Sequence, residues 1–112
     1  MTTNEAAALE QLRNNYDSIH DNLDDLLDAC DGDAECKKQV GTAMNEALEN
    51  YVRAQTRILN QSNDDIAAIN KAASDAQDAI EAALQNLKDI KNFLDNVTQG
   101  VKIVGGLVEA LA

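Results

Sequence analysis

Apolar residues recur at alternating steps of three and four positions along most of the chain, which is the spacing of one face of an α-helix. The first two such series predict helices over residues 4–30 and 34–60. A short Asp31-Gly32-Asp33 segment separates them and interrupts the helical pattern. Because a short connection leaves two helices side by side, we expect an antiparallel hairpin.

The strongest pattern lies in the C-terminal half, where all fourteen a and d positions of seven consecutive heptads are apolar. This pattern predicts a third helix over residues 63–99 and a tail helix over residues 100–112, with bends at Gly100, Gly105 and Gly106. The sequence therefore predicts one all-α domain. Its architecture would be an antiparallel helical hairpin plus a long third helix, arranged as a three-helix bundle or coiled coil with a glycine-hinged apolar tail.

The predicted third helix is longer than the hairpin beside it. At 1.5 Å per residue, a helix from residue 64 to 111 would measure about 70 Å, whereas each hairpin helix would measure about 40 Å. The remainder either folds back on the bundle or pairs with another chain, since a large exposed apolar surface is unfavourable. We therefore predict a partner interface formed by Leu87, Ile90, Leu94, Val97, Val101, Val104, Val108 and Leu111.

Composition narrows the classes of partner. The 112 residues include 9 Lys and Arg against 20 Asp and Glu, for a formal net charge of −11. Such a charge disfavours binding to nucleic acids and to anionic lipid surfaces, because both ligands are themselves negative. Charge is concentrated in residues 1–31, which hold eight acidic residues and one basic residue. This segment is expected to form an acidic face.

Two cysteines flank the Asp-Gly-Asp turn. Cys30 and Cys36 either form a disulfide, which would add about 2 kcal/mol by closing a short loop, or remain two reduced thiols. The N-terminal residues lack the basic and apolar regions of a signal peptide. We therefore expect a cytoplasmic protein or one secreted without a leader.

Residues with catalytic or ligand-binding chemistry are sparse. His20 lies three and four positions from Asp17 and Asp24, a spacing that favours a solvated helix surface over a metal site because further ligands are missing. No nucleophile motif or phosphate-binding glycine loop occurs. We predict a non-enzyme without metal or cofactor.

The short acidic hairpin is similar in shape to the small substrates and partner proteins of bacterial type VII secretion, over roughly the first 60 residues. Those hairpins turn on Trp-x-Gly, whereas this chain has no Trp and turns on Asp31-Gly32-Asp33. Their Tyr-x-x-x-Asp/Glu signal is also missing, because Tyr16 is followed by His20 and Tyr51 by Gln55. No family assignment follows from the resemblance.

Two functions fit these features. The first is a helical module for protein–protein interaction or self-assembly, such as an adaptor, an immunity-type protein or a secretion partner, whose partner is another protein or a copy of the same chain. The alternative is a membrane-active helical protein that inserts residues 97–112 into a bilayer. Lys102, Glu109 and the shortness of this segment favour the first function.

Overall fold

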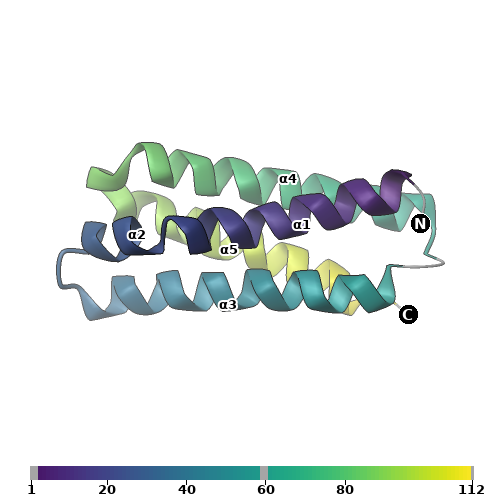
Figure 1. The fold of residues 1–112 in the computed structure, drawn as a ribbon, viewed down its shortest axis with the longest axis horizontal. Coiled ribbons are helices and arrows are strands. Elements are labelled where there is room, and N and C mark those ends of the chain that lie inside the picture. The colour runs from purple at the N-terminus through teal and green to yellow at the C-terminus, as the bar shows by residue number, and fades with distance from the viewer. Residues whose placement is uncertain (1–2, 59–60, 112) are drawn as a thin grey trace.

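The computed structural model describes residues 3–58 and 61–111, and these are helical with no strand among them (Figure 1). This confirms the predicted all-α class. The ends of two predicted helices, at residues 59–60 and 112, lie outside the described residues. The elements are α1 (Thr3–Asp21), α2 (Leu23–Ala29), α3 (Ala34–Arg57), α4 (Asn63–Gln85), the 3-10 turn η1 (Leu87–Asp89) and α5 (Ile90–Glu109).

The helices form a bundle with four rows, because α2 continues the row of α1. Each of α1 and α5 packs against both α3 and α4, so that α1 and α5 occupy opposite corners. Figure 1 shows that α1 and α4 run in one direction while α3 and α5 run in the other. The bundle therefore consists of two antiparallel hairpins, one of α1 and α3 and one of α4 and α5, placed so that parallel helices are also neighbours.

The prediction of one long third helix over residues 63–99 is wrong. The helix ends at Gln85, and the chain reverses through η1 into α5. Asn86 has φ −127° and ψ 51°, outside the helical region, and its side-chain Nδ2 donates to the carbonyl oxygen of Ala82 at 2.9 Å. An asparagine side chain that occupies a carbonyl of the preceding turn offers the backbone an alternative to the helix.

The first predicted helix, over residues 4–30, is also divided. Asn22 separates α1 from α2 with φ −113° and ψ 17°, and its Nδ2 donates to the carbonyl oxygen of Ser18 at 2.8 Å. Both helix breaks therefore use the same local device, an asparagine amide bonded to the carbonyl four residues earlier.

The expectation of a hinge near Gly100 is wrong as well, since α5 is continuous from residue 90 to 109. Gly100 serves packing instead. A Cβ on Gly100 would lie 3.2 Å from both the Cα and the Cβ of Ala76 on α4. The absence of a side chain at Gly100 thus lets α5 approach Ala76 on α4 closely.

These glycine environments predict opposite effects of adding a methyl group. Gly41 lies inside α3 with nothing within 4 Å of its virtual Cβ. Gly41→Ala should raise the free energy of unfolding by about 0.5 to 1 kcal/mol, since alanine favours a helix interior over glycine. Gly100→Ala should cancel or reverse this gain by overpacking the α4–α5 contact. Urea unfolding of the two variants measures both changes in the free energy of unfolding. A lower free energy of unfolding in Gly41→Ala would contradict the prediction for that position.

The core has two main apolar clusters, and a polar layer lies between them. Asn15 on α1 is 3% exposed, and its Nδ2 donates to the carbonyl oxygen of Ala73 and to Oε1 of Gln77, each at 3.0 Å. Asn50 on α3 is also buried, and its Nδ2 donates to the carbonyl oxygen of Val101 at 3.0 Å. Each amide thereby connects a pair of parallel helices, α1 to α4 and α3 to α5.

Candidate functional site

The predicted partner interface lies mostly inside the chain's own core. Its first residue, Leu87, is half-buried and packs against the apolar cluster at the turn end of the bundle. The other seven are buried: Ile90, Leu94, Val97, Val101, Val104, Val108 and Leu111. The predicted length mismatch disappears because residues 90–109 fold back along α3 and α4. The apolar face that suggested an outside partner is therefore covered within a single chain.

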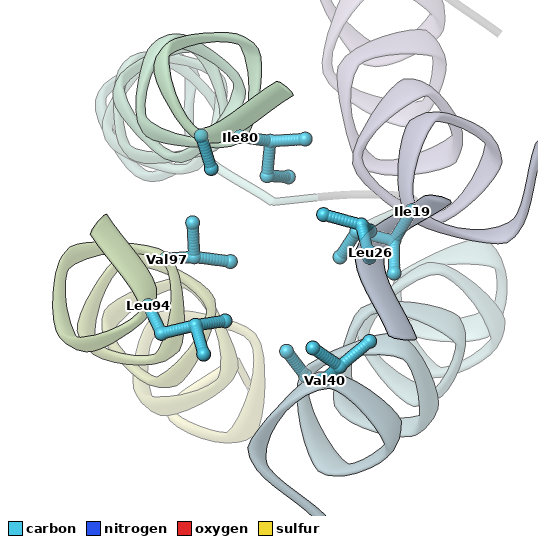
Figure 2. Close-up of a pocket in the computed structure, with 8 residues that line it drawn as sticks. Ile19, Leu26, Val40, Ile80, Leu94 and Val97 are labelled. Carbon is cyan, nitrogen blue, oxygen red and sulfur yellow. The ribbon is translucent and has the colours of Figure 1, made fainter. Parts of the chain in front are cut away.

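A cavity of about 10 Å³ lies in the core next to Leu26 of α2, and Figure 2 shows the side chains around it. Eight apolar side chains line it: Ile19, Leu26, Val40, Ala43, Ile80, Ala83, Leu94 and Val97. A space of this size is at the lower limit for one water molecule, and it lacks the polar partners that a buried water needs. In the closed bundle it is a small dry gap and holds no substrate-sized ligand.

The turn end of the bundle is fastened by covalent and ionic contacts. Cys30 and Cys36 are joined in a disulfide across the α2–α3 turn, with a Cα–Cα distance of 5.5 Å. Asp33 caps α3 by accepting a hydrogen bond from the backbone N–H of Cys36 at 3.0 Å. Its other oxygen lies 2.8 Å from Nζ of Lys91 on α5. The sequence left open whether the two cysteines form a disulfide or remain reduced thiols, and the structure supports the disulfide.

The Lys91–Asp33 contact shifts both groups toward their charged forms. The hydrogen bond from Lys91, followed by that from the Cys36 N–H, lowers the pKa of Asp33 below its usual value. The hydrogen bond to Asp33 in turn raises the pKa of Lys91. Both groups are exposed to solvent, so this contact orients the start of α5 more than it stabilises the fold.

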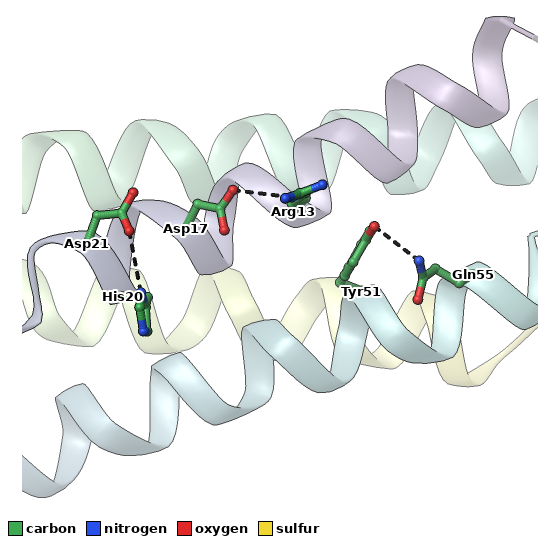
Figure 3. Close-up of polar contacts among 6 residues, drawn as sticks. All are labelled: Arg13, Asp17, His20, Asp21, Tyr51 and Gln55. Carbon is green, nitrogen blue, oxygen red and sulfur yellow. Dashed lines mark hydrogen bonds and ion pairs between the residues drawn. The ribbon is translucent and has the colours of Figure 1, made fainter.

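Charged and aromatic side chains lie along α1, the helix that packs beside α3; Figure 3 shows Arg13, Asp17, His20 and Asp21 among them. Tyr16 stacks on His20 with ring centroids 5.4 Å apart, and His20 Nδ1 lies 3.4 Å from an oxygen of Asp21. Asp17 pairs with Arg13 at 3.4 Å, so the grouping of His20 with Asp17 and Asp24 does not form. No group of three metal-ligating side chains occurs within residues 3–58 and 61–111.

Apolar side chains are exposed on the adjacent side of α3. Leu48 is 39% exposed and Val52 is 51% exposed, one helical turn apart. Tyr51 lies between them in sequence, and its ring points into the space between α3 and α1 in Figure 3. Its hydroxyl accepts a hydrogen bond from Gln55 at 3.0 Å. We call Leu48, Tyr51 and Val52, with the neighbouring surface of α1, the α1–α3 face.

On the other side of α3 a polar groove separates it from α5. Arg53 lies 2.7 Å from Glu109 on α5 and 3.6 Å from Glu49 on its own helix. Gly105 and Gly106 form part of the opposite wall. Arg53 pairs with two of the three carboxylates that line this groove, whereas Oε2 of the third, Glu46, is buried without a hydrogen-bond partner among the described residues.

Comparison of the chain with family models, curated proteins and solved structures finds no match. Among the described helices, none combines the length and apolar character required to cross a membrane. In residues 97–112, the segment considered for membrane insertion, Val97, Val101, Val104 and Val108 are buried in the core. Ala112 lies outside the described residues.

The α1–α3 face was not selected from the sequence. Leu48 and Val52 only widened the apolar series of the second helix, beyond the positions needed for one contact stripe. These additional apolar residues were the sequence feature that could have indicated the face, because apolar positions outside the a and d seam fall on the flank of a helix. Their exposure became clear only once the second hairpin was seen to occupy the other side of α3.

Proposed function

We propose that this chain is a non-enzymatic helical module that binds another protein through the α1–α3 face. The observation that carries the proposal is the exposure of Leu48 and Val52, two large apolar side chains one turn apart on a single helix. Apolar side chains at this spacing lie on one face of the helix, where the apolar stripe of a partner helix can pack against them. The heptad face of α5 is not part of this proposal, because it is already buried.

Charge specifies the chemistry of the partner. Residues 1–31 carry a formal charge of −7, from eight acidic residues and one Arg. Glu10, Asp17 and Asp21 recur along α1 at spacings that place them on one side of the helix. A partner helix with an apolar stripe flanked by Lys or Arg would bury its stripe on Leu48 and Val52 and direct its cations to α1.

Fluorescence anisotropy with a labelled amphipathic Leu/Lys peptide of about 18 residues, five helical turns, tests this proposal. The double variant Leu48→Gln, Val52→Gln should weaken binding by about tenfold or more, since apolar burial is lost while charge is unchanged. Ile103→Gln is the matched control, because Ile103 is 53% exposed on α5, outside the α1–α3 face. It should change affinity by less than about twofold.

Equal losses of peptide affinity in the double variant and in Ile103→Gln would overturn the proposal, because they would indicate that the peptide is attracted to the net charge alone. Absence of binding to the full chain would also overturn it. Sedimentation of the chain without peptide provides a further outcome. If the chain forms dimers that dissociate in the double variant, the same face joins two copies and the partner of different chemistry is rejected.

A further inference from the structure

The short helix α2 carries an unusual concentration of unpaired charge. Three of its seven residues are carboxylates, Asp24, Asp25 and Asp28, and all three are exposed. No ion pair between described residues involves any of them. Asp24 and Asp25 lie in the first turn, where the helix dipole favours a negative charge, whereas Asp28 lies in the last turn, where the dipole disfavours it. Mutual repulsion therefore favours the release of α2 from its helical conformation.

The contacts that oppose this repulsion come from the apolar side of one short helix, on which Leu23, Leu27 and Ala29 pack against the core beside Leu26. Leu26 is the buried residue of α2, and Asn22 separates α2 from the continuous helix α1. A helix of this length is not stable by itself in water. At its C-terminal end, Cys30 is bonded to Cys36 on α3, which fixes α2 to a long helix of the bundle.

The small gap in the core lies next to Leu26 of α2. Figure 2 shows Leu26 and Ile19 pointing toward Val40, Leu94 and Val97 around the small cavity described above. Because Leu26 forms one wall of this cavity, displacement of α2 would convert a closed gap into an open apolar pocket. The remaining walls come mainly from α3, α4 and α5, which have their own mutual contacts.

We propose that α2 is a flap held closed by the disulfide, and that reduction of Cys30–Cys36 opens the apolar pocket beneath it. A dithiol supplies two electrons and two protons, the S–S bond breaks to give two thiols, and the dithiol leaves as its own disulfide. α2 then unfolds locally while α3, α4 and α5 remain folded. This inference rests on α2 and the disulfide and is independent of the proposed protein-binding face.

Hydrogen exchange of the full chain before and after treatment with dithiothreitol tests the proposal, with thiol labelling used to establish that two free thiols are present. The amides of α2 should exchange at least about tenfold faster after reduction. The amides in the middle of α3, α4 and α5 should change by less than about twofold. Fluorescence of 1-anilinonaphthalene-8-sulfonate should rise in parallel, because the probe binds exposed apolar surface.

Two variants distinguish the flap from a general loss of stability. Cys30→Ala, Cys36→Ala should reproduce fast exchange in α2 and should not respond to dithiothreitol. Asp28→Asn should recover part of the protection of α2 in the reduced protein, because it removes the repulsion with Asp24 and Asp25 and the unfavourable charge at the end of the helix. Unchanged exchange in α2 after reduction would overturn the proposal, and so would equal acceleration in all helices, which would make the disulfide a staple of the whole fold.

Discussion

Val104→Asp should remove most of the stability of the bundle, whereas Ile103→Asp at the adjacent position should leave it nearly unchanged. Val104 is fully buried in the core, and Ile103 is 53% exposed on the outer side of α5. An unpaired carboxylate at position 104 should lower the free energy of unfolding by about 4 kcal/mol or more, a large part of the stability of a small domain. At position 103 the change should remain within about 0.5 kcal/mol.

Thermal and urea unfolding followed by circular dichroism measure this difference. If Val104→Asp fails to fold, Val104→Ala provides a graded version, with an expected loss of about 2 kcal/mol. A C-terminal segment that projected from the bundle would make positions 103 and 104 equally tolerant. Equal stability of the two Asp variants would therefore contradict the folded-back position of α5.

Asn15→Asp should produce the second large loss, of about 3 kcal/mol at neutral pH. The change keeps the shape of the side chain but replaces the Nδ2 donor by an oxygen facing two acceptors, the Ala73 carbonyl and Oε1 of Gln77. A buried acceptor without a donor loses its hydration without compensation, and the negative charge adds to this penalty. Asn14→Asp is the matched control, because Asn14 is only half-buried.

The loss in Asn15→Asp should depend on pH in a defined direction. Burial raises the pKa of the introduced carboxyl above the unfolded value of about 3.9. The penalty is smallest below that unfolded value, where the carboxyl is neutral in both states, and grows as pH rises toward its folded pKa. Urea unfolding of Asn15→Asp and Asn14→Asp between acidic and neutral pH measures the difference. A difference independent of pH would contradict the burial of a charge at this position.

The sequence predicted the helical class and the Asp31-Gly32-Asp33 turn, because helical periodicity and turn chemistry are local properties. It left open whether Cys30 and Cys36 are bridged. It failed at Asn86 since the apolar heptad pattern continues through the reversal without a change of register. Both α4 and α5 need an apolar stripe, so periodicity alone cannot separate one long helix from two that fold together. In the structure the reversal begins at Asn86, whose side chain donates to the Ala82 carbonyl.

The buried faces of the first two helices are rotated slightly about the helix axes relative to the faces predicted from the sequence. Tyr16 and Met44 belong to the apolar series of the first two predicted helices, yet both are half-buried, whereas Ala8 and Asn50, which lie outside these series, are buried. In an isolated hairpin, the apolar core would be centred between the two helices. The second hairpin moves that centre toward α4 and α5, and this shift leaves Leu48 and Val52 near the surface. The α1–α3 face thus arises from an arrangement that local patterns do not encode.

The beginning of α1 and the end of α5 lie at the same end of the bundle (Figure 1), on rows that occupy opposite corners. A mechanical load applied between these two points would act across the bundle axis. The contacts between helices would then break one after another, whereas a load along the bundle axis would act on all of them at the same time. We therefore expect this domain to yield at low force when stretched by its two ends, although its core is closely packed.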